Sequence, residues 1–216
     1  MKLGLTDVSK RVCVMLPTFN EAENIERILD EIRSQGDDID VLVVDDGSPD
    51  GTGRLADEYS KRCEGRVFVL HRVGERGRGV AGVEGFKWII SRGYGFVLEM
   101  DADGSHDPSM IPVFRRMIDG VDVVVGSRYV KGGEVVDSGF GHRILSWTAN
   151  LFNRLVLGLD VRDASGGFKL YRAGALESIG LDSVKSWGYS IGCEILYKLN
   201  RGGFEIREVP IVFRDR

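Results

Sequence analysis

Short apolar segments alternate with segments of helical periodicity along the first 127 residues of the chain. The apolar segments have few polar interruptions and end near glycine, proline or aspartate, which is typical of parallel strands buried on both faces. They predict strands over residues 12–16, 40–44, 67–70, 95–100 and 121–126, separated by helices over residues 20–34, 52–63, 82–91 and 109–119. This order predicts an α/β fold of three layers, with helices on both faces of a mostly parallel central sheet.

The alternation changes after Arg128. A glycine-containing stretch at residues 131–133 precedes a long helix predicted over residues 141–158, a helix over 190–200 and a strand over 205–213. No linker or internal repeat divides the sequence, so we expect a single domain over residues 1–216. Its end at Arg216, close to the last strand, is compatible with a truncated chain or with a disordered tail.

The helix predicted over residues 141–158 carries an apolar stripe. The stripe consists of Ile144, Leu151, Phe152, Leu155 and Leu159, with Trp147 nearby and Arg143 and Arg154 at its sides. An apolar stripe bordered by tryptophan and arginine can lie in a membrane interface. An amphipathic helix that faces the protein core has the same spacing, and the sequence leaves both interpretations open.

Polar clusters follow three of the predicted strands. They are residues 17–21, the pair Asp45–Asp46, and Asp101-Ala102-Asp103. Ligands of parallel sheets bind at the carboxyl ends of the strands, so we expect these clusters to share one edge. Paired carboxylates suit Mg²⁺ or Mn²⁺, and such an ion with open coordination positions suits a diphosphate. A solvated acidic turn is the alternative interpretation of residues 101–108.

Composition narrows the possible classes of protein. The chain is 43 % hydrophobic and carries a net charge of −4, which divides into −7 before residue 128 and +3 from there on. A nucleic-acid-binding protein would be more basic, so we expect no nucleic-acid partner. Cys13, Cys63 and Cys193 have no paired spacing and indicate reduced thiols and a cytoplasmic location. We find neither a signal peptide nor an apolar run long enough to span a membrane, although the chain could lie on one.

Six motifs carry a family resemblance. They are residues 16–25 (LPTFNEAENI), 43–52 (VVDDGSPDGT), 100–108 (MDADGSHDP), 126–130 (GSRYV), 163–169 (DASGGFK) and 208–213 (EVPIVF). With these motifs in this order, the chain resembles family-2 glycosyltransferases with the GT-A (Rossmann-like) fold. It is most similar to the branch of dolichyl- and polyprenyl-phosphate mannose synthases, and the resemblance covers nearly the whole chain.

The resemblance implies an activity and its partners. The activity is metal-dependent transfer of a sugar with inversion, with mannose from GDP-mannose as the donor and a polyprenyl or dolichyl phosphate as the acceptor. UDP-glucose is the alternative donor. Residues about 10–127 would form the nucleotide-binding half and residues about 128–216 the acceptor-side half. Peripheral contact with the cytoplasmic face of a membrane, and a membrane-anchoring partner, are also implied.

The resemblance also assigns site residues. Those implied to bind the nucleotide sugar are Pro17, Thr18, Phe19, Glu21, Val44, Asp46, Asp101, Ala102 and Asp103. Those implied to hold Mg²⁺ or Mn²⁺ are Asp101, Asp103 and Ser105, and those implied to bind the acceptor phosphate are Arg128, Arg143 and Arg216. Asp101, Asp103 and Arg128 would be catalytic.

The chain departs from the family pattern in three places. The family usually continues past Arg216 with a Gly-x-Ser-Lys segment that this sequence does not contain, so the resemblance supports the acceptor contacts less well than the donor contacts. The loop at residues 74–79 (GERGRG) replaces a lysine-containing loop, and Gly104 stands where leucine is common.

An acceptor phosphate monoester, with its second pKa at about 6, needs no general base. The three histidines accordingly suggest no base–nucleophile pair.

Other interpretations compete with the resemblance. Residues 41–46 (VLVVDD) also resemble the start of a receiver-type signalling domain, but there the acidic pair follows the first strand and here a strand and a helix precede it. Residues 77–82 (GRGVAG) fit the dinucleotide pattern GxGxxG, but a charged loop separates them from the preceding strand, which favours a phosphate- or acceptor-side loop. A non-catalytic nucleotide-sugar-binding subunit is a further alternative.

Two polar residues near the predicted site are expected to have structural roles. We expect Asp45 to cap its loop and His106 to be a turn residue.

Overall fold

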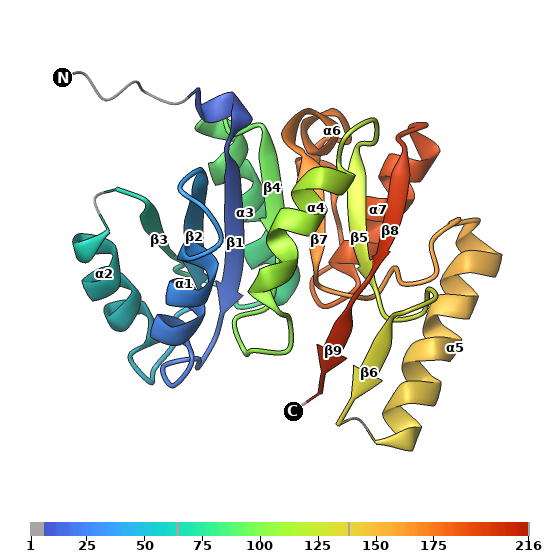
Figure 1. Cartoon of the computed structure of the whole chain (residues 1–216), viewed down its shortest axis with the longest axis horizontal. Helices are drawn as coiled ribbons and strands as arrows, with labels where there is room; N and C mark the ends of the chain where they lie inside the picture. The colour runs from blue at the N-terminus through green and yellow to red at the C-terminus, as the bar shows by residue number, and fades with distance from the viewer. Residues whose placement is uncertain (1–6, 64, 138, 216) are drawn as a thin grey trace.

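A seven-stranded sheet forms the centre of the molecule (Figure 1). The computed structural model describes residues 7–63, 65–137 and 139–215, without the side chains of Phe140, His142, Arg143 and Leu145. The strands are β1 (Val12–Thr18), β2 (Ile39–Asp45), β3 (Val67–His71), β4 (Phe96–Glu99), β5 (Val123–Ser127), β7 (Lys169–Arg172) and β8 (Ile206–Pro210). Their order across the sheet is β3-β2-β1-β4-β7-β5-β8.

Most neighbouring strands run parallel. β1 pairs in parallel with β2 and β4, β2 with β3, and β5 with β8. Only β7, among the strands of the described ranges in this sheet, runs antiparallel to its neighbours β4 and β5. The prediction of a mostly parallel central sheet is therefore confirmed.

Helices cover both faces of the sheet and bury two apolar layers. α1 (Ile25–Arg33), α2 (Thr52–Arg62) and α4 (Ile111–Met117) pack on one face. α3 (Arg78–Ser91), α6 (Ala173–Ser178) and α7 (Ile191–Arg201) pack on the other. Because successive side chains of a strand point to opposite faces, Val14 of β1 joins the first layer and Met15 the second. The apolar strands are thus buried on both sides, as their sequences predict.

Short 3₁₀ helices and a second sheet complete the fold. The 3₁₀ helices are η1 (Val8–Lys10), η2 (Pro108–Met110) and η3 (Leu181–Ser183). β6 (Glu134–Val136) pairs in parallel with β9 (Val212–Arg214). The long helix α5 (Phe140–Leu157) follows β6 and lies beside this small sheet, at the edge of the molecule (Figure 1).

Three predicted boundaries are wrong. The predicted helix over residues 20–34 begins at Ile25, because the backbone N–H groups of Asn20, Glu21 and Ala22 instead bind side chains of residues 48–52. The helix predicted to begin at residue 82 begins at Arg78. The strand predicted over residues 205–213 is two strands, β8 and β9, which belong to different sheets.

The apolar stripe of α5 faces away from the core. Its side chains at Ile144, Leu151, Phe152 and Leu155 are exposed, and only Leu159, just beyond the helix, is buried. The core-facing interpretation therefore fails for the part of the stripe that lies on the helix. No helix within the described ranges is long and apolar enough to cross a membrane.

Candidate active site

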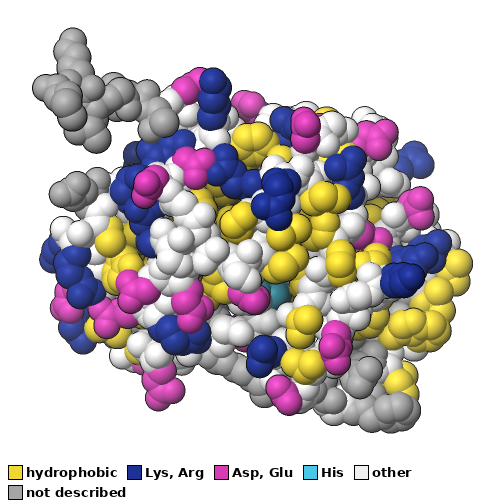
Figure 2. All heavy atoms as spheres, in the orientation of Figure 1, with side chains coloured by type: hydrophobic (Ala, Val, Ile, Leu, Met, Phe, Trp, Pro, Cys, Tyr) yellow, Lys and Arg dark blue, Asp and Glu magenta, His cyan; other side chains and the backbone are white. Residues whose placement is uncertain are grey.

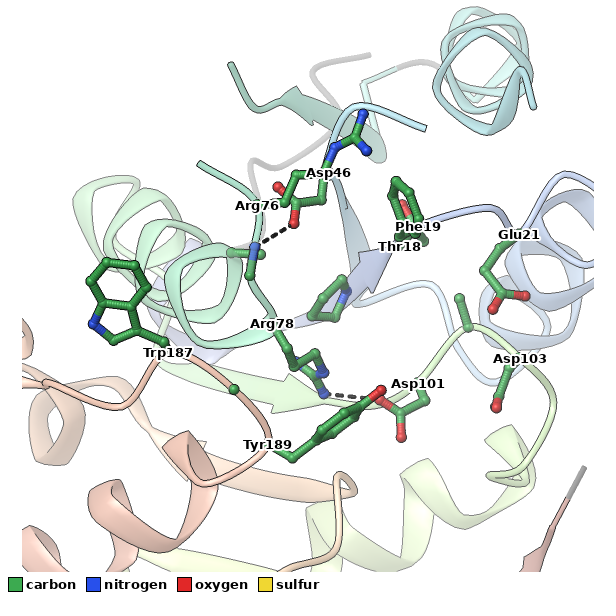
Figure 3. A pocket seen from close by; sticks show the side chains of 15 residues that line it. Thr18, Phe19, Glu21, Asp46, Arg76, Arg78, Asp101, Asp103, Trp187 and Tyr189 are labelled. Atoms are coloured by element: carbon green, nitrogen blue, oxygen red, sulfur yellow. Dashed lines mark hydrogen bonds and ion pairs between the residues drawn. The ribbon is translucent and has the colours of Figure 1, made fainter. Parts of the chain in front are cut away.

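The carboxyl ends of β1, β2 and β4 border a cavity of about 510 Å³ (Figure 3). Its lining consists of Pro17, Thr18, Phe19, Glu21, Asp46, Arg76, Gly77, Arg78, Ala81, Asp101, Ala102, Asp103, Trp187, Gly188 and Tyr189. The three polar clusters predicted at strand ends all contribute to it. The topology explains this convergence, because β2, β1 and β4 are adjacent and parallel.

Asp101 and Asp103 lie on the loop that follows β4, and local hydrogen bonds fix both residues. The backbone N–H of Ser105 donates to the Asp103 carboxylate at 2.9 Å, and the backbone N–H of Asp101 donates to His106 Nδ1 at 3.1 Å. Gly104 has a φ of +84°, a left-handed conformation that glycine adopts without strain. The loop therefore presents the two carboxylates at the cavity wall.

The carboxylates fit a hard divalent cation. No cluster of three or more His, Cys, Asp and Glu side chains suited to a metal exists among the residues the structure describes. Asp101 and Asp103 would thus supply two oxygen ligands, and Mg²⁺ and Mn²⁺ commonly take the rest from substrate phosphates and water. Ser105, the predicted third ligand, does not line the cavity, and its Oγ is buried without a hydrogen-bond partner.

Arg78, the first residue of α3, forms ion pairs with two acids at this wall. Its Nη2 donates to Asp101 Oδ1 at 2.9 Å (Figure 3). Its Nη1 lies 3.0 Å from Glu99 Oε1. Burial raises the pKa of the Asp101 carboxyl. Arg78 and His106 lower this pKa by a larger amount, so the net pKa is below the usual value. Asp101 is therefore ionised at neutral pH.

Asp45 and Asp46 have separate roles, as the sequence predicts. The Asp45 carboxylate accepts the Ser48 hydroxyl at 2.5 Å and caps its loop, which confirms the prediction for Asp45. The Asp46 carboxylate lines the cavity and accepts the backbone N–H of Gly77 at 2.8 Å and the Arg72 guanidinium. Asp46 thereby joins the end of β2 to the start of α3, and its contact with a nucleotide stays a prediction.

Aromatic side chains border the cavity on two sides. Phe19 is 44 % exposed, and the Arg76 guanidinium carbon lies 4.8 Å from its ring centroid. Trp187 and Tyr189 are 65 % and 86 % exposed, and their loop docks on α3 through the Gly79 N–H, which donates to the Trp187 carbonyl at 2.9 Å. The rim can therefore stack on a planar or ring-shaped ligand.

The sequence analysis named none of Arg76, Trp187 and Tyr189, and it included Arg78 only within the phosphate- or acceptor-side loop expected over residues 77–82. Trp187 and Tyr189 lie more than 80 residues from the Asp-Ala-Asp motif, and no local pattern connects the two segments. Arginines between glycines at residues 74–79 were a usable signal, because a charged side chain in a glycine-rich loop after a strand often binds phosphate.

Some of the predicted site residues do not reach the cavity. The Val44 side chain is fully buried in the layer under α3, and Arg128 is not part of the lining. The side chain of Arg143 and the whole of Arg216 lie outside the described residues. His106 is buried and stacks on Phe168, so it is a structural residue beneath the loop that follows β4, and burial lowers its pKa.

Arg128 is committed to a buried ion pair. Its Nε and Nη2 each donate to the Asp163 carboxylate at 2.7 Å, and its backbone N–H donates to the same carboxylate at 2.9 Å. Asp163 is fully buried, whereas 11 % of the Arg128 side chain is exposed. Burial lowers the pKa of Arg128, but Asp163 raises this pKa by a larger amount, so both groups are charged. A phosphate would therefore compete with Asp163 for the guanidinium.

Comparison with known proteins identifies the family. Residues 13–180 match the model of glycosyl transferase family 2. The chain belongs to glycosyl transferase family 2. It is therefore a glycosyltransferase, which confirms the resemblance found in the sequence and excludes the receiver-type signalling domain.

Two similar proteins span nearly the whole chain. A polyprenol monophosphomannose synthase of Mycolicibacterium smegmatis is 42 % identical over 209 residues, which are 96 % of this chain and 79 % of that protein. An undecaprenyl-phosphate mannosyltransferase of Micrococcus luteus is 41 % identical over 206 residues, or 95 % of this chain and 84 % of that protein.

Solved structures support the fold. Glucosyl-3-phosphoglycerate synthase from Mycobacterium tuberculosis, in complex with Mn²⁺, UDP and product, aligns with a TM-score of 0.69 at 20 % identity, over 100 % of this chain and 78 % of that one. A mannosyltransferase from Pyrobaculum calidifontis, in complex with GDP-Man and Mn²⁺, aligns with a TM-score of 0.61 at 19 % identity, over 95 % of this chain and 56 % of that one. These likenesses confirm the GT-A type of fold.

Proposed function

We propose that this glycosyltransferase transfers mannose from GDP-mannose to a polyprenyl phosphate, with inversion and with Mg²⁺ or Mn²⁺. The observation that carries the proposal is the pair Asp101 and Asp103 at the wall of a cavity of about 510 Å³ at the carboxyl edge of the sheet. That volume is in the range of small-molecule sites. The names of the two relatives above 40 % identity support the sugar and the acceptor.

The proposed reaction breaks the bond between the anomeric carbon and the diphosphate. Asp101 and Asp103 would hold a divalent ion, whose positive charge offsets the negative charge that develops on the leaving group. The acceptor phosphate, with its second pKa near about 6, is already dianionic and attacks without a general base. In agreement, neither His71 nor His106 lines the cavity. Direct displacement gives an inverted anomeric centre, and a product with retained configuration by NMR would contradict the mechanism.

A thermal-shift panel tests the donor and the cation together. We expect GDP and GDP-mannose to stabilise the protein in the presence of Mn²⁺, and UDP and UDP-glucose to have a smaller effect. A ligand at one hundred times its dissociation constant stabilises by about 2.7 kcal/mol. A larger shift with the uridine nucleotides would replace the proposed donor by UDP-glucose, and no shift with any nucleotide would contradict the proposal.

We also propose that α5 rests on the membrane that contains the acceptor. Exposed side chains on this helix include Trp147, Phe152, Leu155 and Val156, and Figure 2 shows hydrophobic side chains gathered at the edge of the molecule where α5 lies. A groove of about 360 Å³ beside them is lined in part by Arg154 and Arg162. Apolar and basic side chains in this arrangement suit an anionic lipid surface. The three free cysteines support the cytoplasmic face.

Replacing Phe152 and Leu155 together with serine tests this contact. The two side chains are 59 % and 73 % exposed, so their loss leaves the core unchanged. Full burial of one such apolar side chain in the membrane contributes at most about 1.5–3 kcal/mol to binding. We therefore expect the double variant to bind vesicles with anionic lipid about 10- to 100-fold more weakly in a sedimentation assay. Turnover of a short, water-soluble polyprenyl phosphate should not change. Val8→Ser, at an exposed site on η1, is the control. Unchanged vesicle binding by the double variant would contradict the proposal.

A further inference from the structure

The guanidinium of Arg78 binds the carboxylate that is predicted to hold the metal. Its Nη2 donates to Asp101 Oδ1 at 2.9 Å, whereas Asp103 binds the backbone N–H of Ser105. Asp101 is one third exposed at the cavity wall, and Arg78 is 17 % exposed. A cation that binds Asp101 from the cavity therefore meets a positive charge already in contact with the same carboxylate.

Glu99 fixes the position of Arg78. This carboxylate is almost fully buried, and its Oε1 lies 3.0 Å from Arg78 Nη1. Departure of Arg78 would remove an ion-pair partner from a buried carboxylate, which favours the position of Arg78 beside Glu99. Its second nitrogen, which contacts Asp101, can change partner without breaking the contact with Glu99.

The surroundings leave room for such a change. Arg78 and Asp101 also line a small cavity of about 50 Å³, together with Glu99, Gly167 and Lys169. Arg78 also lines the main cavity. The guanidinium thus stands between a buried acid and the space in which a diphosphate would lie.

We propose that Arg78 is an internal counter-ion that competes with the divalent cation for Asp101, and that a diphosphate releases this competition by offering Arg78 a new partner. Cation and nucleotide would then bind cooperatively, each making the site more favourable for the other. The inference rests on the proposed function only in that the donor carries a diphosphate. Competition for Asp101 is a property of the protein and the cation alone.

Titration of Mn²⁺, followed by electron paramagnetic resonance, tests the competition without turnover. We expect Arg78→Gln to bind Mn²⁺ alone about tenfold more tightly than the unmodified protein, because one positive charge beside Asp101 is removed while a neutral hydrogen-bond donor remains. GDP should tighten Mn²⁺ binding in the unmodified protein by a factor in the usual range of about 5–150, and by a much smaller factor in Arg78→Gln.

Two further variants make the test specific. Arg54→Gln removes an equal charge on α2, outside the cavity lining, where the side chain is 67 % exposed and pairs with Glu58, and we expect unchanged Mn²⁺ affinity. If Arg78→Gln does not fold, Arg78→Lys replaces it. A lysine ammonium lacks the planar fork that spans Glu99 and Asp101, so Mn²⁺ alone should bind about threefold more tightly.

The outcomes separate this inference from the proposed function. Equal or weaker binding of Mn²⁺ alone by the Arg78 variants would overturn the competition, even if GDP-mannose proves to be the donor. Tighter binding in these variants would support the competition, even if the protein prefers another nucleotide. Equal cooperativity between Mn²⁺ and GDP in the unmodified protein and in Arg78→Gln would overturn the release by diphosphate.

Discussion

We expect Asp103→Asn to lower turnover by at least about 100-fold while the protein stays folded. Removal of one group that stabilises charge in a transition state commonly costs about 10²–10³ in rate, and loss of a metal-binding carboxylate acts on the same charge. Asparagine has the same shape, and its Oδ1 can still accept the backbone N–H of Ser105, which Asp103 binds at 2.9 Å. The rate with saturating donor and acceptor, measured over a series of Mn²⁺ concentrations, gives the effect.

Asp107→Asn is a matched control for this variant. Asp107 lies four residues further along the same loop, is exposed, and accepts the backbone N–H of Ser109 at 2.9 Å. The substitution therefore removes the same charge and keeps the same kind of hydrogen bond outside the cavity, so we expect nearly full activity. An Asp103→Asn protein with unchanged rate and unchanged metal dependence would refute the assignment of Asp103 to the metal.

Asp101→Asn would be a less specific test. Its carboxylate also pairs with Arg78, which in turn neutralises the buried Glu99. Loss of the Asp101 charge would therefore change the electrostatics of three side chains and the stability of the α3 start. A low rate in that variant would not separate metal binding from the position of Arg78, whereas Asp103 forms no comparable ion pair within the described part of the chain.

The sequence predicts the sheet edge well because its signals are local. β1, β2 and β4 are nearly continuous apolar runs, and parallel pairing brings their carboxyl ends together. The start of α3 was predicted four residues late because glycine is a poor helix former. Gly79 is required there by tertiary contact, since a Cβ at this position would lie 2.2 Å from the Ser186 carbonyl oxygen. No local pattern in the sequence contains that constraint.

The side chains of the site were predicted unevenly for the same reason. Residues on the strand-end loops, such as Phe19 and Asp103, follow directly from motifs and line the cavity. Tyr189 reaches the cavity only because its loop docks on α3, far away in the sequence. Arg128 was predicted to bind phosphate because it is a charged residue in a family motif. The structure reveals its contact with Asp163, 35 residues away.

We expect Asp163→Asn to destabilise the protein by about 3–5 kcal/mol. Asp163 is fully buried and accepts three hydrogen bonds from Arg128, and removal of one member of a buried ion pair leaves the other charge without compensation. At about 2–4 °C per kcal/mol for a chain of this size, Tm should fall by about 6–20 °C in calorimetry. Asp160→Asn, at a side chain that is 97 % exposed three residues earlier, should leave Tm nearly unchanged.

The dependence on pH distinguishes the ion pair from a packing defect. Burial raises the pKa of Asp163, but Arg128 lowers this pKa by a larger amount. The folded-state pKa is therefore below the unfolded value of about 3.9. The ionised carboxylate therefore contributes its full stability above the unfolded pKa and loses it as the pH falls through the folded pKa. The difference in unfolding free energy between Asp163→Asn and the unmodified protein should be constant from about pH 5 to 8 and narrow below about pH 4. A loss under about 1 kcal/mol at pH 7 would mean that Arg128 is weakly held by Asp163 and free to bind an acceptor phosphate with both of its nitrogens.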